Sequence, residues 1–170
     1  EAYLDKYKSI ADPRRRTYAA MVECLDTAVG DVAKAALDRG PTLIIFVSDN
    51  GGPRGAGADN GELRAGKSTV FEGGIRVPAF FRFSNTLTPA EFGELSSIAD
   101  LLPTIAEVAG VRHAGKPLDG VSLWPALQGT AKVARDELFF CVQPDRGPRQ
   151  QALRKGPWKL VRMSGPQPKD

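Results

Sequence analysis

Three polar side chains in the first half of the chain could together bind a metal ion and an anion. Asp49 and Asn50 come one residue after the apolar run Leu43–Val47, and two glycines follow them. Asp offers a charged oxygen and Asn a neutral carbonyl oxygen, which are ligands suited to Ca²⁺ or Mg²⁺. Lys67 lies on a glycine-bounded loop and could present its ammonium group to an anion. Taken singly, the SDNGG run could also be an Asx turn and Lys67 an ordinary exposed lysine.

The same lysine also falls within a match to the phosphate-binding loop, because Gly61–Thr69 contains the pattern G-x-x-x-x-G-K-S. A working loop of this kind needs a strand directly before its first glycine and a helix that opens at the Lys-Ser pair. The preceding residues, PRGAGADN, cannot form a core strand, and Gly73 and Pro78 leave no room for a helix of normal length. Glu62 would place a carboxylate inside the phosphate cradle. The sequence therefore disfavours nucleotide hydrolysis.

An α/β fold must position these side chains. Asp12 and Pro13 predict the start of a helix, and apolar residues recur at steps of three and four as far as Leu37. Leu43–Val47 is apolar without alternation, which is typical of a strand buried on both faces of a parallel sheet. A helix that leads into such a strand favours an α/β fold, with helices flanking a mostly parallel sheet.

Further elements follow the long glycine-rich loop after Asn50. VPAFFRF predicts another strand, and Asp100 predicts the cap of a short helix that ends at Gly110. ELFFCV, QALRK and WKLVRM predict the short strands of a small antiparallel region, with the last two joined around Gly156-Pro157.

The composition of the 170 residues is that of a globular chain, with 42% hydrophobic and 25% charged residues. The net charge of +3 is small and spread along the chain, so a nucleic-acid partner is not indicated. No apolar run approaches the roughly 18 residues that a membrane span needs. Cys24 and Cys141 are expected to be core residues whose pairing the sequence does not assign, and His113 is expected at the surface.

Six segments occur in one order along the chain: YAAMVECLDTAVGDV, TLIIFVSDNGG, LRAGKSTVFEGGIRVPAFFR, SIADLLPTIAEVAGV, LDGVSLWPALQG and LRKGPWKLV. This succession resembles the C-terminal half of the formylglycine-dependent sulfatases, within the alkaline phosphatase-like superfamily. The opening EAYLDKYKSIADPRRRTYAAMVECLD resembles the arylsulfatase B type most. The resemblance implies a fragment of the sulfatase fold. Residues 1–130 would be the C-terminal part of the α/β catalytic domain, and residues 131–170 the start of a smaller antiparallel-sheet region.

The resemblance also implies a reaction, the hydrolysis of sulfate esters. Asp49 and Asn50 would be two ligands of an active-site calcium (or magnesium) ion, and Lys67 would be a catalytic and substrate-binding residue that contacts the sulfate group or the ester oxygen. The family's nucleophile is a formylglycine made from a Cys or Ser in the motif C/S-x-P-x-R. Cys141 comes closest to this motif, but its Pro and Arg are each one position late. The chain alone is therefore expected to be inactive.

The implied partners are a sulfate ester substrate (an aryl sulfate or a sulfated sugar) and the N-terminal half of the same protein. That half would supply the nucleophile, two Asp ligands and part of the sheet. The chain begins at Glu1 without a signal peptide, and a lysosomal, periplasmic or secreted location is expected for the full-length protein. Two alternatives stay open, a phosphonate or phosphate ester hydrolase on the same metal scaffold and a non-catalytic relative that binds sulfated glycans. The sequence upstream of Glu1 would separate them.

Overall fold

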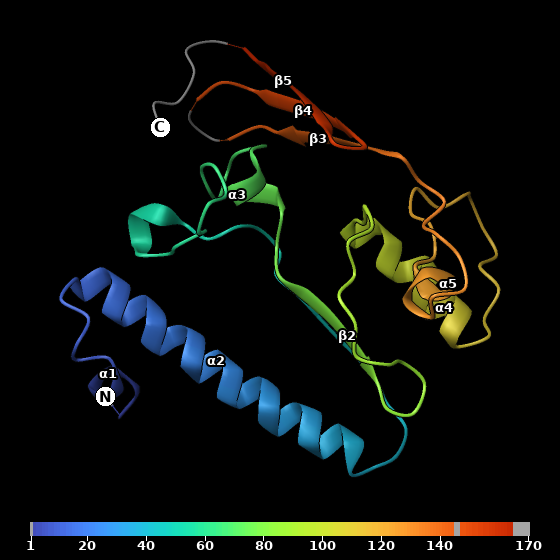
Figure 1. Ribbon diagram of the computed structural model, residues 1–170, viewed down its shortest axis with the longest axis horizontal. Coiled ribbons are helices and arrows are strands. Elements are labelled where there is room, and N and C mark those ends of the chain that lie inside the picture. The colour runs from blue at the N-terminus through green and yellow to red at the C-terminus, as the bar shows by residue number, and fades with distance from the viewer. Residues whose placement is uncertain (1, 145–146, 165–170) are drawn as a thin grey trace. The chain divides into compact units, whose positions relative to one another are not determined.

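The computed structural model describes residues 2–144 and 147–164, which divide into two compact units (Figure 1). Unit 1 comprises residues 2–83, and unit 2 comprises the described residues from 84 onward. The elements of unit 1 are α1 (Ala2–Lys6), α2 (Pro13–Leu37), β1 (Leu43–Val47), the 3₁₀ turn η1 (Arg54–Ala56), α3 (Glu72–Ile75) and β2 (Ala79–Phe83). Those of unit 2 are the 3₁₀ turn η2 (Ile98–Asp100), α4 (Leu101–Val108), α5 (Trp124–Leu127), β3 (Glu137–Val142), β4 (Gln150–Lys155) and β5 (Trp158–Met163).

Helix α2 begins and ends where the sequence predicts. Asp12 is its N-cap, and the Asp12 carboxylate accepts a hydrogen bond of 2.9 Å from the Arg14 backbone N–H. Pro13 takes the first helical position, where its missing N–H costs nothing. The helix ends at Leu37, and Gly40 follows with a φ of 137°, which favours glycine. None of the helices within the described residues is long and apolar enough to span a membrane.

Strand β1 is confirmed as a strand, but its surroundings differ from the prediction. It pairs antiparallel with β2, with Leu43 opposite Phe83, and the rings of Phe46 and Phe80 stack with their centroids 5.2 Å apart. All five residues of β1 are half-buried, so the expected burial on both faces is wrong for this chain. The reason is that the described chain supplies only one neighbouring strand, which leaves the second edge without a strand against it. Both sheets of the described residues are antiparallel, and a parallel neighbour of β1 stays a prediction.

A groove of about 460 Å³ separates α2 from β1, and mostly apolar side chains line it, among them Val29, Val32 and Ile45. The apolar stripe of α2 is largely open to solvent, with Val32 71% and Met21 64% exposed. Burial of apolar surface stabilises a fold by about 25 cal/mol per Å². Unit 1 therefore presents apolar surface that gains stability from a further covering segment.

Unit 2 contains the antiparallel region that the sequence predicts. Its three strands lie in the order β3-β4-β5, and a turn in which Gly156 has a φ of 52° joins β4 to β5. One face of this sheet is exposed and carries the cross-strand row Phe139, Leu153 and Leu160. Cys141 belongs to this exposed face, since it lies two residues after Phe139 on the same strand.

Both cysteines are exposed and free, so the expectation that they are core residues is wrong. Cys24 lies on the open side of α2, where the described chain places nothing over it, and Cys141 lies on the open face of β3. His113 is exposed, as predicted. The expected domain boundary at residue 130 stays a prediction.

Helix α4 is confirmed, and Asp100 occupies its N-cap position as the sequence predicts, but the Asp100 side chain makes no capping hydrogen bond to α4. The Asp100 carboxylate is fully buried and accepts backbone hydrogen bonds from Ser97 at 2.7 Å and from Val121 at 2.9 Å. The guanidinium of Arg135 donates two more, at 2.6 and 2.7 Å. A buried charge is stable only when it is paired and hydrogen-bonded. The bond from Ser97 belongs to the local capping box of η2, and Val121 and Arg135 are the tertiary partners of the carboxylate.

Thr104 extends this arrangement. Its hydroxyl donates to the Asp100 backbone carbonyl at 2.6 Å and accepts from the Leu123 N–H at 2.9 Å. Thr104 is fully buried and Leu123 is 2% exposed. The Asp100 network therefore fixes the start of α4 to the segment before α5 and to the segment before β3. It comprises Ser97, Asp100, Thr104, Val121, Leu123 and Arg135.

Candidate functional site

Backbone hydrogen bonds hold the end of β1 beside the loop that carries Lys67. The Lys67 N–H donates to the Gly52 carbonyl at 3.3 Å, and the Gly51 N–H donates to the Gly74 carbonyl at 2.9 Å. The Gly73 N–H donates to the Arg64 carbonyl at 2.8 Å. Segments that are distant in sequence thus meet at one place, which we call the loop junction (residues 51–52, 60, 64–67 and 73–74).

The Asn60 side chain fastens the loop junction. Its Oδ1 accepts from the Gly52 N–H at 3.0 Å, while its Nδ2 donates to the carbonyls of Gly52 at 3.0 Å and Ala65 at 2.9 Å. Three hydrogen bonds from one amide join the segment after Asn50 to the segment before Lys67. Sequence reasoning identified Asn60 only as a loop residue, because an Asn in a glycine-rich loop gives no signal of which distant backbone groups it will bind.

Glycines are required in the loop junction because its backbones pack directly on one another. A Cβ at Gly51 would overlap the carbonyl of Gly73, and a Cβ at Gly66 would lie 2.5 Å from the Gly52 carbonyl oxygen. Both are closer than real side chains approach a backbone atom. Contact between the backbones of three chain segments therefore explains why SDNGG, AGK and EGG have glycines at these positions.

The backbone around Lys67 is strained and well anchored. Ala65 and Ser68 adopt left-handed φ angles of 61° and 69°, which cost roughly 1 kcal/mol or more for residues other than glycine. Val70 is fully buried and Phe71 is 8% exposed, and burial of each such side chain contributes on the order of 1.5–3 kcal/mol. The burial of Val70 and Phe71 can offset this strain. The surrounding packing therefore holds the backbone that carries Lys67 in its strained conformation.

The three side chains predicted to do chemistry have no partners among the residues that the structure describes. Asp49 and Lys67 are exposed and Asn50 is half-buried. None of the three side chains forms a hydrogen bond or an ion pair with any residue that the structure describes. The loop junction thus brings their backbones into one region, but it shows no contact between the side chains of Asp49 and Lys67. All three remain available to a ligand.

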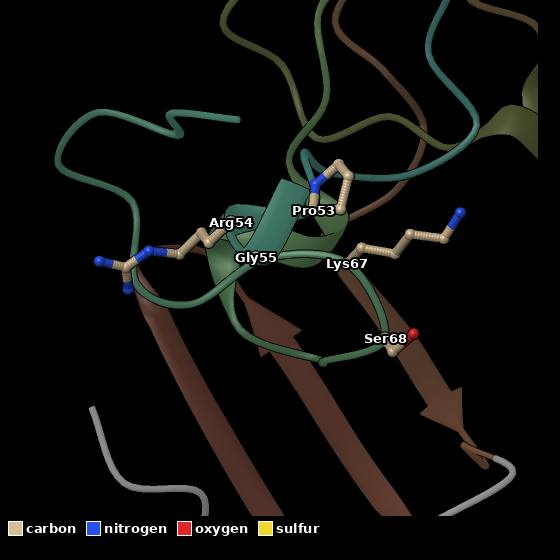
Figure 2. Close-up of a pocket in the computed structure, with 6 residues that line it drawn as sticks. Pro53, Arg54, Gly55, Lys67 and Ser68 are labelled. Carbon is tan, nitrogen blue, oxygen red and sulfur yellow. The ribbon is translucent and has the colours of Figure 1, made fainter. Parts of the chain in front are cut away.

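Lys67 lies at the rim of a cavity of about 360 Å³, which Figure 2 shows. Arg54 also lines this cavity, and the Arg54 and Lys67 side chains point away from each other (Figure 2). No helix opens at Lys67 and Ser68, since the short helix α3 begins only at Glu72 and spans four residues. The geometry agrees with the prediction that this is not a nucleotide phosphate-binding loop.

Asp49 and Asn50 fit part of a calcium site and not the whole of one. They supply two oxygen donors, whereas Ca²⁺ takes six to eight oxygen ligands. The described residues contain no group of three or more His, Cys, Asp or Glu side chains placed to hold a metal ion. A complete site would need ligands from beyond these residues.

Comparison with known proteins supports the family that the motifs suggest. The family model "Sulfatase" matches residues 1–111. The chain is 42% identical to arylsulfatase A from Bos taurus, and the match covers 82% of this chain and 28% of that protein. It is 36% identical to a sulfatase from Formosa agariphila, over 79% of this chain and 28% of that protein. It is 38% identical to steryl-sulfatase from Mus musculus, over 72% and 22%.

A solved structure, that of Ps i-CgsB in complex with k-i-k-neocarrahexaose, resembles the chain with a TM-score of 0.86 and 34% identity. This match covers 98% of the chain and 38% of the solved one. The chain spans about 28% of the length of the arylsulfatase A proteins that it matches. The particular likeness of its opening to the arylsulfatase B type stays a prediction.

Proposed function

This chain belongs to the sulfatase family, with its alkaline phosphatase-like fold, and from that premise we propose that the full-length protein is a sulfuric ester hydrolase. The observation that carries the proposal is the loop junction, which lies within the matched residues 1–111. It contains Lys67 and directly follows Asp49 and Asn50, and the three side chains have no partner in the described part of the chain. Unpartnered polar groups on a strained, fixed backbone are typical of sites whose partner is a ligand.

Lys67 would act on the sulfate group. Its ammonium stands on a loop that the hydrogen bond to Gly52 fixes, and no described carboxylate neutralises it. A compact cation at this position can bind a sulfate oxygen and stabilise the negative charge that develops on the leaving ester oxygen. Because it gains most when that charge appears, its contribution is expected mainly in the chemical step.

Asp49 and Asn50 would hold a calcium ion, or a magnesium ion in its place, together with ligands from the rest of the protein. Such an ion, when bound, supplies positive charge that polarises sulfate oxygens. The formylglycine nucleophile would come from a Cys or Ser outside this chain. The role of the chain's own residues is to bind the ion with two oxygens and the sulfate group with one ammonium.

The N-terminal part of the same protein is the proposed partner of unit 1. The groove between α2 and β1 is apolar, and α2 exposes both Met21 and the groove-lining Val32. A segment that lies in this groove and pairs with the second edge of β1 would complete a sheet flanked by helices, with parallel pairing at that edge. The proposed location of the full-length protein is lysosomal, periplasmic or secreted.

A phosphonate or phosphate ester hydrolase of the same superfamily, or a non-catalytic relative that binds sulfated glycans, would share this scaffold. The relatives named arylsulfatase and steryl-sulfatase favour sulfate esters over both. An assay of the purified full-length protein with a nitrophenyl sulfate and the matching nitrophenyl phosphate, with calcium present, tests the proposal. We expect multiple turnovers of the sulfate ester and at most slow turnover of the phosphate.

The isolated chain of 170 residues is the matched control, because it lacks the nucleophile. We expect it to release no nitrophenol, and a separately made N-terminal half that carries the aldehyde to restore some turnover. Preferred turnover of the phosphate ester by the full-length protein would replace the proposal with a phosphatase. Turnover by the isolated chain would show that the chemistry assigned to Asp49, Asn50 and Lys67 is wrong.

A further inference from the structure

The Asn60 amide spends its whole donor capacity on the backbone near Lys67. Its NH₂ group has two hydrogens, and the carbonyls of Gly52 and Ala65 accept from Nδ2 at 3.0 and 2.9 Å. Its Oδ1 accepts from the Gly52 N–H at 3.0 Å, so these partners fix which way the amide points. A Cβ at Gly52 would lie 2.8 Å from Oδ1, and one at Gly66 would lie 2.8 Å from Nδ2. The backbones of both glycines therefore enclose the amide.

The two carbonyls that Asn60 binds are the ones that set the backbone of Lys67. The Gly52 carbonyl also accepts the Lys67 N–H, at 3.3 Å, so one oxygen joins Asn60 to Lys67. Ala65 lies two residues before Lys67 and has a φ of 61°, which is unfavourable for a residue with a Cβ. The hydrogen bond from Asn60 thus holds a residue whose conformation is costly by itself.

The Lys67 side chain does not fix its own position. It is exposed, it has no side-chain partner in the part of the chain that the structure describes, and it points away from the Arg54 side chain (Figure 2). The place of its ammonium therefore depends on the backbone that carries it. Through Gly52, Asn60 joins this backbone to the segment that directly follows Asp49 and Asn50.

We propose that Asn60 is a positioning residue, which sets where the Lys67 ammonium lies relative to the oxygens of Asp49 and Asn50. This inference rests on the proposed function, in which Lys67 contacts the sulfate group. A misplacement of about 1 Å at a reacting centre can lower the rate about 100-fold. Because Asn60 acts through Lys67, its effect on turnover should disappear when the ammonium is absent.

Asn60→Asp is the sharpest variant, because it keeps the shape of the side chain and turns the donor into an oxygen that faces two carbonyl oxygens. In the full-length protein, with calcium and a nitrophenyl sulfate, it should lower kcat by about tenfold. The loss should not exceed that of Lys67→Ala. KM should change little, because the ammonium matters most when the leaving oxygen becomes negative. Rates are taken per folded protein, well below the melting temperature of each variant.

Asn85→Asp is the matched control. Asn85 is an exposed asparagine of unit 2 with a left-handed φ of 63°, and its substitution adds the same charge. It should leave kcat unchanged.

A double-mutant cycle with Lys67→Ala separates positioning from a general structural role. Asn60→Asp added to Lys67→Ala should lower kcat little further, since no ammonium is left to position. An equal fold loss in both backgrounds would show that Asn60 acts independently of Lys67, and it would overturn this inference. An unchanged kcat of Asn60→Asp in the otherwise wild-type protein would overturn it as well, with the sulfatase function intact.

Asn60→Ala is the second variant, because it removes the three hydrogen bonds without adding a charge, and the same cycle applies to it. If neither variant folds, the amide serves the fold alone and the positioning role is wrong. A kcat of Lys67→Ala equal to that of the wild type would remove the role of Lys67 and this inference with it, while the sulfatase activity stands. A wild-type protein that does not turn over the sulfate ester would overturn the proposed function itself.

Discussion

The loop junction of unit 1 and the Asp100 network of unit 2 use polar groups in opposite ways. In the Asp100 network, a fully buried carboxylate has four hydrogen bonds from three donors, and the Arg135 side chain that pairs with it is only 10% exposed. In the loop junction, the backbone and Asn60 make the structural hydrogen bonds, while Lys67 and the nearby Asp49 stay exposed, with no side-chain partner among the residues described.

Burial and hydrogen-bond partners distinguish a structural charge from a functional one. A buried charge whose partners are all present holds segments together and has no capacity left for a ligand. An exposed charge on a fixed backbone keeps that capacity. Asp100 and Asp49 are both aspartates at the end of a short element, and only their partners distinguish them. Substitutions in the Asp100 network should therefore affect stability, and substitutions at Asp49 or Lys67 should affect activity.

The largest expected effect is on stability in unit 2. Arg135→Met removes the cation from Asp100 and leaves a buried carboxylate without its counter-ion, which should cost about 3–5 kcal/mol. Denaturant unfolding of the full-length protein measures this loss. Lys132→Met, at an exposed residue of the same segment, is the control and should change little. A loss below about 1 kcal/mol in Arg135→Met would show that the network does not stabilise the unit as its geometry indicates.

The second effect is on activity in unit 1. Asp49→Ala removes the charged oxygen proposed to bind the metal ion and should lower kcat/KM by at least about 100-fold, because even partners beyond the direct ligands contribute 10–100-fold. Calcium affinity should fall in parallel, as measured by the calcium concentration for half-maximal turnover, and the melting temperature of the metal-free protein should stay close to that of the wild type.

Glu62→Ala is the control for Asp49→Ala, because it removes another exposed carboxylate from the same loop. It should leave both turnover and calcium dependence unchanged. Wild-type activity of Asp49→Ala at ordinary calcium concentrations would exclude Asp49 as a ligand, and it would place Asp49 with the structural charges of this comparison.

The third effect separates charge from shape at Lys67. A planar guanidinium does not replace a compact ammonium on a tightly built loop, so Lys67→Arg should lose nearly as much activity as Lys67→Ala, on the order of tenfold or more. The loss should lie in kcat, measured under saturating substrate, because the charge matters most when the leaving oxygen becomes negative. Full activity of Lys67→Arg would reduce the role of Lys67 to general electrostatic attraction.

Local sequence signals predict where helices and strands begin and end. The pairing of strands and of distant side chains depends on long-range contacts, which the sequence does not display. Asp12, Pro13 and Gly40 mark the ends of α2 because capping and glycine conformations involve only neighbouring residues. The antiparallel partner of β1 lies more than thirty residues away on β2, and Arg135 lies 35 residues from Asp100. No local pattern encodes such pairs.

The candidate site shows the same division. The segments SDNGG and GKS, together with the family resemblance, predict Asp49, Asn50 and Lys67 as site residues, because the sequence displays the residue types on which the chemistry of a ligand site depends. The three hydrogen bonds of the Asn60 side chain could not be predicted, since they follow from how the loop folds back on itself.

The smallest expected effect concerns an ion pair in unit 1 that is exposed where the Asp100 pair is buried. Lys6 joins α1 to Glu23 of α2, with the Lys6 side chain 64% exposed. The hydrogen bond from Lys6 lowers the pKa of the Glu23 carboxyl below its usual value near 4.5, although partial burial opposes this shift. A carboxyl whose pKa is lower in the folded than in the unfolded chain stabilises the fold at neutral pH, and this stabilisation is lost as pH falls below 4.5 and through the folded pKa.

Lys6→Gln should therefore raise the pKa of Glu23 towards its usual value, which an NMR titration of the Glu23 carboxyl measures. Its melting temperature at pH 7 should fall far less than that of Arg135→Met, because solvent and salt screen an exposed pair. The difference between Lys6→Gln and the wild type should vanish in acid, once Glu23 is protonated in both proteins. A loss as large as that of Arg135→Met would mean that α1 docks on α2 through this pair alone, and burial would no longer separate strong charge pairs from weak ones in this chain.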